Sequence, residues 1–244
     1  MKSNNRSLNT TILAVLIVFI VILTSFQISA KPDSKLKTRE EKSVRKIFTL
    51  SDNWRFQLDI RDIGEKEGWF NDDFKRVNWE KVLVPQAWDL YEDAMWEYEG
   101  IGWYTTIITH DESIAVKKTE VVFGRVMYYS KVWLNGEFIG ENIGGYLPFS
   151  FDITKYLKSG QKNKLVVRVN NRARIEWLPA AEQIEWIQYG GILEPVKLVS
   201  KSQIYINDLI VRTIPDNGGA HINCLINIAN ETAIETEMDL NICI

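Results

Sequence analysis

From residue 47 onward, short apolar runs alternate with turn residues, and no long stretch repeats its apolar positions at the spacing of a helix. Successive side chains of a strand point to opposite faces, so short runs of this kind are typical of strands with a buried face. Many such strands at modest spacing predict an all-β sandwich. We expect strands at residues 54–58, 81–84, 102–109, 119–123, 128–134, 149–152, 164–170 and 196–200.

Two turn signals connect the predicted strands. Asn135-Gly136 lies between Val132-Trp133-Leu134 and Phe138-Ile139, and this dipeptide tolerates the positive φ angles of a two-residue hairpin turn. Residues 152–157, followed by Ser159-Gly160, are typical of a single helical turn that joins two strands. The sequence therefore predicts one tight hairpin and one helical connection.

A domain boundary is expected near residues 200–203. Beyond it, residues 204–213, 221–229 and 235–244 are three more predicted strands, and Asp216-Asn217-Gly218-Gly219 marks the turn between the first two. Three strands leave an open edge and half a core. The carboxyl-terminal part is therefore predicted to be the truncated start of a second sandwich.

The amino terminus predicts export. Lys2 and Arg6 precede an apolar run over residues 12–23, and the segment ends on the small residue Ala30. Residues 1–30 are therefore predicted to be a secretory signal peptide.

A retained membrane anchor over residues 11–28 is the alternative, because an apolar run extended to Ile28 nearly reaches the length of a membrane span. Residues 31–46 are charged and poor in large apolar side chains, which predicts a linker. Under either interpretation the remaining chain is exported to the periplasm or the extracellular space.

Composition narrows the range of partners. Nine Trp residues fit a large core or a ligand-facing surface, since Trp buries much apolar area and stacks on flat partners. The net charge of −3 and the lack of a basic stripe argue against nucleic acid. Cys224 falls on the apolar face of its predicted strand and Cys243 on the face opposite the apolar set of its own, so free thiols are expected and the compartment stays undecided.

Several segments together resemble the sugar-binding domain that opens glycoside hydrolase family 2 enzymes, the family of β-galactosidases, β-glucuronidases and β-mannosidases. Each segment alone is a weak signal, and their order and spacing over residues 47–202 are specific. The segments are Val84-Pro85-Gln86-Ala87-Trp88, Tyr98-Glu99-Gly100-Ile101-Gly102-Trp103-Tyr104, Val132-Trp133-Leu134-Asn135-Gly136, Gly144-Gly145-Tyr146-Leu147-Pro148-Phe149, Phe151-Asp152-Ile153-Thr154 and Tyr189-Gly190-Gly191-Ile192.

The resemblance implies a jelly-roll-like, galactose-binding-domain-like sandwich over residues 47–202. An immunoglobulin-like domain, begun by residues 203–244, and a (β/α)8 barrel with two catalytic glutamates would follow. Such a barrel takes roughly 250 residues, and its catalytic groups come from different strands. The 244 residues leave no room for one, so no catalytic residue is assigned and the chain alone is predicted to be inactive.

The resemblance also suggests substrate contacts. In the family, the loop corresponding to residues 93–99 reaches toward the active site, where Trp96 and Tyr98 can stack on a sugar and Glu97 can accept hydroxyl hydrogens. The alternative is a surface loop whose aromatic residues pack on a neighbouring domain or subunit. Trp177, just before Pro179, has the same two interpretations. In contrast, strand patterns place Trp54, Trp103 and Trp133 in the core.

A second candidate segment contains Glu182, Glu185 and Trp186. A pair of carboxylates can act on a glycosidic bond, and the family loop near this position lends an acidic group to the sugar pocket in some members. The match is loose, because Ile184 stands about where β-galactosidases often carry an Asp. Substrate contact and a solvated loop both remain open, and catalysis is the least favoured interpretation.

No cofactor and no metal site are predicted, although Asp72 and Asp73 leave a calcium ion as a minor alternative. His110 and His221 lack Cys or His partners at ligand spacing. The favoured function is the non-catalytic, sugar-binding part of an exported family 2 β-glycosidase. Its expected partners are a β-glycoside and a catalytic barrel, with membrane contact only through the amino terminus. A stand-alone lectin-like protein and an inactive truncated remnant are the alternatives.

Overall fold

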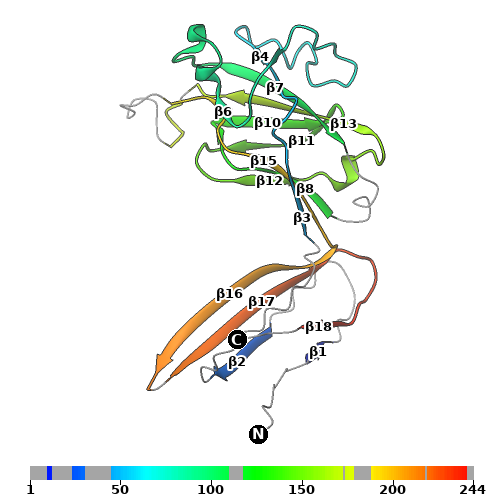
Figure 1. Ribbon diagram of the computed structural model, residues 1–244, viewed down its shortest axis with the longest axis vertical. Coiled ribbons are helices and arrows are strands. Elements are labelled where there is room, and N and C mark those ends of the chain that lie inside the picture. The colour runs from blue at the N-terminus through cyan, green and yellow to red at the C-terminus, as the bar shows by residue number, and fades with distance from the viewer. Residues whose placement is uncertain are drawn as a thin grey trace. The chain divides into compact units, whose positions relative to one another are not determined.

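The computed structural model describes residues 10–12, 24–30, 45–109, 118–172, 174–178, 188–217 and 219–240. It is almost entirely β-structure, which confirms the predicted all-β class (Figure 1). The chain divides into two compact units. Val44–Lys201 forms the larger unit, and the segments before and after it form the smaller one.

The larger unit contains two main sheets and a small third one. One main sheet has the order β11-β10-β13-β7-β4-β5, and the other has the order β12-β8-β15-β3. The six strands of the first are β4 (Arg55–Leu58), β5 (Glu80–Lys81), β7 (Ile101–Thr109), β10 (Tyr129–Leu134), β11 (Glu137–Ile143) and β13 (Lys162–Asn170). The others are β3 (Lys46–Thr49), β8 (Lys118–Phe123), β12 (Phe149–Asp152) and β15 (Val196–Lys201), with β6 (Gln86–Ala87), β9 (Val126–Met127) and β14 (Gly191–Ile192) in the small sheet.

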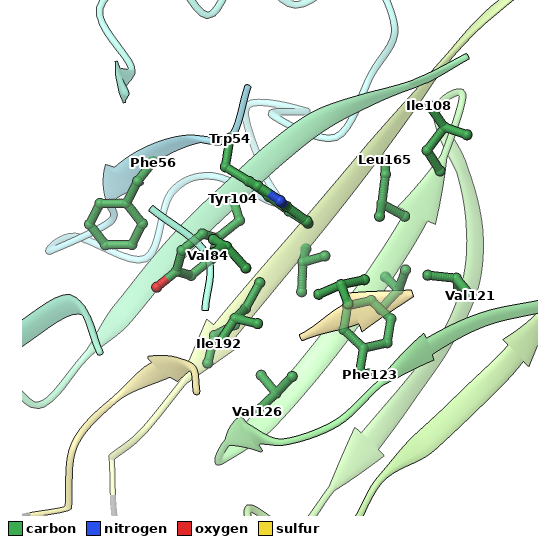
Figure 2. Close-up of a cluster of buried hydrophobic side chains, with 14 of the residues drawn as sticks. Trp54, Phe56, Val84, Tyr104, Ile108, Val121, Phe123, Val126, Leu165 and Ile192 are labelled. Carbon is green, nitrogen blue, oxygen red and sulfur yellow. The ribbon is translucent and has the colours of Figure 1, made fainter. Parts of the chain in front are cut away.

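The main core is built from alternate residues of both main sheets. In β13, Leu165, Val167 and Val169 point into this core, as the alternation of a strand requires. Figure 2 shows Trp54 of this cluster among side chains from both sheets, so the prediction that Trp54 is a core residue is confirmed. Full burial of one large apolar side chain contributes roughly 1.5–3 kcal/mol, so this cluster is the main source of stability.

A second cluster lies on the opposite face of the six-stranded sheet. Trp103 and Trp133 are buried there as expected, with their rings stacked 5.3 Å apart. The segment of residues 59–79 covers them and contributes Trp69 and Trp79 to the cluster. These four Trp side chains account for much of the Trp excess in the composition.

The two predicted turns are confirmed. Asn135 and Gly136 adopt φ angles of 55° and 85°, as a type I′ hairpin turn requires. The helical connection is the 3-10 turn η4 (Thr154–Tyr156). In contrast, the strand predicted at residues 81–84 is limited to Glu80–Lys81. Beyond it, Val82 still donates its backbone N–H to the Trp54 carbonyl at 3.1 Å.

The smaller unit has a sheet of order β16-β17-β2, formed by β16 (Ile204–Asp216), β17 (Gly219–Asn230) and β2 (Thr24–Ala30). The first two are longer than predicted. The third expected strand is represented by β18 (Met238–Leu240), which pairs with β1 (Thr10–Ile12), and residues 241–244 lie outside the described part.

Cys224 is buried with Ile226 and Ile228, as the alternation of its strand predicts, and it forms no disulfide within the described residues. Cys243 and most of the predicted export segment lie outside them. No helix that the structure describes has the length and apolar character needed to cross a membrane.

Candidate functional site

Three segments that are distant in the sequence meet in the larger unit, namely residues 86–90, the loop that contains Tyr98, and residues 188–192. Gln86 and Ala87 of β6 pair with Ile192 and Gly191 of β14. Directly after β6, the 3-10 turn η1 (Trp88–Leu90) begins. The Trp88 backbone N–H donates to the Gly190 carbonyl at 3.0 Å, and the Trp88 indole N–H donates to the Tyr98 carbonyl at 3.3 Å. Trp88, which is fully buried, is therefore the centre of this junction.

Both backbone polar groups of Gly190 are hydrogen-bonded. Its carbonyl accepts from Trp88, and its N–H donates to Oδ2 of Asp89 at 2.9 Å. A Cβ on Gly190 would lie 2.1 Å from a ring carbon of Trp88, so the position has no space for a side chain. The neighbouring Gly191 has a φ of +104°, which favours glycine. The Gly-Gly pair is thus explained by close packing and by backbone conformation.

The side chain of Asn171 connects residues 98–100 to Gln188, the residue before Tyr189. Its Oδ1 accepts the Gly100 N–H at 2.8 Å, and its Nδ2 donates to the Tyr98 carbonyl at 3.0 Å. The same Nδ2 lies 3.4 Å from the Gln188 carbonyl. Asn171 is 1% exposed, and an amide that uses both its donor and its acceptor in the interior is a rigid connection.

Asp89 is a buried acid in this junction, with 3% of its surface exposed. Burial raises the pKa of its carboxyl above the ordinary value, while the hydrogen bond from the Gly190 N–H and the nearby backbone N–H groups oppose the rise.

That loop presents two of its three predicted residues to solvent. It follows the 3-10 turn η2 (Asp93–Met95), whose last residue, Met95, is buried in the core. Trp96 is 53% exposed, and its indole N–H donates to Oε1 of the exposed Glu97 at 3.2 Å. Tyr98 instead turns inward, with its ring 5.9 Å from that of Trp88.

The structure adds Tyr189, which the sequence reasoning missed as a site residue. The rings of Tyr189 and Trp96 are 6.4 Å apart with an interplanar angle of 72°, and Tyr189 is 41% exposed. Its place before Gly190-Gly191 in the sequence motif was the available signal. Trp96, Glu97 and Tyr189 together are called the rim below.

The remaining predicted site residues fall elsewhere. Trp177 is 8% exposed and lies outside the rim. Its ring stacks on that of Tyr128 at 4.6 Å, and the guanidinium of Arg174 is 5.2 Å from its centroid. Glu182, Glu185 and Trp186 lie outside the described residues.

The rim has the chemistry of a surface that holds a flat, hydroxyl-rich molecule. Trp96 and Tyr189 offer exposed aromatic area, and the Glu97 carboxylate accepts hydrogen bonds. Among the residues that the structure describes, no group of three His, Cys, Asp or Glu side chains is arranged to hold a metal ion.

The comparison with family models gives the class of this domain. Residues 47–202 match the model described as glycosyl hydrolases family 2, sugar binding domain. The chain therefore belongs to this family, and its larger unit is a family 2 sugar-binding β-sandwich.

The chain spans about a fifth of the length of the curated relatives that it matches. A β-galactosidase from Thermoanaerobacter pseudethanolicus is 34% identical over 141 residues, which are 56% of this chain and 19% of the relative. A putative β-glucuronidase from Formosa agariphila is 31% identical over 176 residues, which are 67% of this chain and 16% of the relative.

Solved structures agree with this placement. A β-glucuronidase from Ruminococcus gnavus in complex with D-glucuronic acid has a TM-score of 0.71 and 25% identity, over 78% of this chain and 36% of that one. A β-glucuronidase from an uncultured Clostridium species has a TM-score of 0.69 and 26% identity, over 79% of this chain and 35% of that one. The chain spans about a third of the length of these enzymes.

Proposed function

We propose that this chain is the sugar-binding part of an exported β-glycosidase, which contacts a β-linked carbohydrate through Trp96, Glu97 and Tyr189. Membership of residues 47–202 in the family 2 sugar-binding domains carries this proposal. The basic and apolar amino terminus supports export.

The rim supports recognition of a sugar by its physical character. An exposed indole ring binds the C–H face of a pyranose, and a carboxylate next to it accepts hydrogen bonds from the hydroxyl groups. The junction around Trp88 supports the same proposal, because Asp89 and Asn171 hold both sides of the rim through backbone hydrogen bonds. A ligand then binds with little ordering cost.

The described residues favour binding over hydrolysis. A retaining glycosidase needs two carboxyl groups about 5–5.5 Å apart, one of which remains protonated at working pH. Asp89 is the acid here whose pKa is raised, and at 3% exposure it is closed to a substrate. Glu97 is exposed to solvent instead. In a longer protein that includes a catalytic barrel, this domain would brace the barrel and shape its pocket, and the barrel would perform the double displacement.

Turnover is the first test. The purified chain is expected to release no product from a panel of aryl β-glycosides. Turnover that persists after contaminating enzymes are removed would show that the chain has catalytic groups of its own.

Binding is the second test. Titration with β-linked oligosaccharides, followed by calorimetry, is expected to give weak saturable binding that Trp96→Ala reduces by about tenfold, equivalent to about 1.4 kcal/mol. Tyr146→Ala, at an exposed aromatic residue in the loop before β12, is the matched control and is expected to leave binding unchanged. Equal binding by the Trp96→Ala chain would refute the assignment of carbohydrate binding to the rim.

The lectin-like alternative makes a different prediction for the same titration. Micromolar affinity for a polysaccharide fragment without any barrel would favour a stand-alone binding protein. Weak binding favours a domain whose rim completes a larger pocket.

A further inference from the structure

A pocket of about 350 Å³ is lined by Gln57 and Leu58 of β4 and by residues of the covering segment 59–79. Its floor includes the buried Trp69 and Trp79, and its walls include Gln57, Arg61, Lys75 and Asn78. None of the rim residues lines it. The volume lies at the lower end of the range for sites that hold small molecules.

The aromatic floor of the pocket is rigid. The rings of Trp69 and Trp79 are 5.9 Å apart, and Trp69 is also 5.9 Å from Trp103 of the sheet. Asp59 fastens the covering segment at its start, because its carboxylate accepts the Ile63 and Gly64 N–H groups as well as the Trp103 indole N–H. The floor is therefore formed before any ligand binds.

Two cationic side chains, those of Arg61 and Lys75, line the pocket. Within the described part of the chain, neither Arg61 nor Lys75 forms a hydrogen bond or an ion pair, and both are exposed. Asp59 already accepts three hydrogen bonds. An anion that entered the pocket would thus meet two free positive charges.

The carboxylates nearby are engaged with other cations. Asp62 pairs with Arg168 at 2.8 Å. Asp72 pairs with Lys158 at 3.1 Å, and Asp73 acts electrostatically on Arg76. Asp59 also lines the pocket and accepts hydrogen bonds from neutral donors, so the lining carries the two positive charges of Arg61 and Lys75 against one negative charge.

We propose that this pocket binds a sugar carboxylate, at a site separate from the rim. Arg61 pairs with the carboxylate in a bidentate manner, as guanidinium groups do, and Lys75 adds a second positive charge. Asn78 and Gln57 exchange hydrogen bonds with the hydroxyl groups, and the ring packs on the floor of Trp69 and Trp79.

The test is calorimetric titration of the full chain with D-glucuronate, D-glucose and acetate. D-Glucuronate is expected to bind in the millimolar range and at least about tenfold more tightly than either of the others. D-Glucose lacks the carboxylate and acetate lacks the ring. Equal affinity for D-glucuronate and either comparator, or no binding of D-glucuronate, would overturn the proposal.

Variants assign the binding to the pocket. Arg61→Ser and Lys75→Ser are each expected to weaken D-glucuronate binding by about tenfold, the effect of losing a hydrogen bond to a charged group. Lys66→Ser removes an exposed lysine of the same segment that does not line the pocket, and it is expected to change affinity by less than about twofold. An equal loss in the Lys66→Ser chain would mean non-specific charge attraction and would refute the site.

The rim variant separates this site from the proposed function. Trp96→Ala is expected to leave D-glucuronate binding at the pocket unchanged. Loss of that binding in the Trp96→Ala chain would place the ligand at the rim and would overturn the pocket, while the proposed function would stand.

Discussion

The carboxylate of Asp89 accepts the backbone N–H of Gly190 at 2.9 Å across 101 residues of sequence. Both residues are buried. Each directly follows an aromatic residue of the site. Trp88 precedes Asp89, and Tyr189 precedes Gly190. This hydrogen bond therefore connects the buried core to the rim.

Removing the acceptor of this bond is expected to destabilise the fold. Asp89→Ala leaves the Gly190 N–H buried without a partner and should lower the free energy of unfolding by about 1–3 kcal/mol. Asp89→Asn retains an acceptor oxygen and should recover most of the loss. Urea unfolding measures both changes, and equal stabilities of the two variants would show that the hydrogen bond contributes little.

The pH dependence of stability should reveal the raised pKa of Asp89. Because the pKa of the folded state lies above the ordinary value of 3.8, the folded state binds the proton more tightly than the unfolded state. The resulting stabilisation is fully present below the ordinary pKa and is lost as pH rises through the folded-state pKa. The stability of the wild type relative to Asp89→Asn should therefore fall as pH rises from about 3.8. Urea unfolding of both chains across this range is the measurement, and a rising difference would contradict the assignment.

Gly190→Ala should disrupt the junction. Its Cβ would lie 2.1 Å from the Trp88 ring, so either the ring or the backbone must move, at a cost of about 1–3 kcal/mol or more. Gly219→Ala is the control, because its Cβ meets nothing within 4 Å. Thermal unfolding compares the two, and similar melting temperatures would show that the junction tolerates the added methyl group.

The hairpin turn offers a prediction that separates backbone from side chain. Asn135 has a φ of 55°, and its Oδ1 accepts the Lys164 N–H at 2.9 Å. Asn135→Ala should cost about 2–3 kcal/mol, because it adds left-handed strain to the loss of hydrogen bonds. Asn135→Gly relieves the strain and should recover about half. If the glycine variant is as unstable as the alanine variant, backbone conformation is unimportant at this turn.

The strands with regular alternation were predictable from the sequence. Strands β7, β10, β13 and β15 match the expected ranges within a few residues, as does the Asn135-Gly136 hairpin. Each depends on a local pattern, namely side-chain alternation or a dipeptide suited to positive φ angles. The same reasoning correctly expected buried side chains at Trp54, Trp103 and Trp133.

The short strands were not predictable. β6, β9 and β14 contain two residues each, and β6 and β14 pair across about a hundred residues. Two residues have no periodicity to recognise, and their pairing exists only because the larger sheets bring them together. β3 was missed for a related reason, since it is an exposed edge strand.

By itself, the sequence determined the all-β class, the hairpin and the order of motifs that is specific for the family, because these depend on local pattern and spacing. Only the tertiary structure decided that Tyr98 and Trp177 pack inward, that Tyr189 joins Trp96, and that Asp89 holds Gly190. Which face of an aromatic residue meets water, and which buried acid finds a donor, depend on residues that are brought together only when the sheets pack.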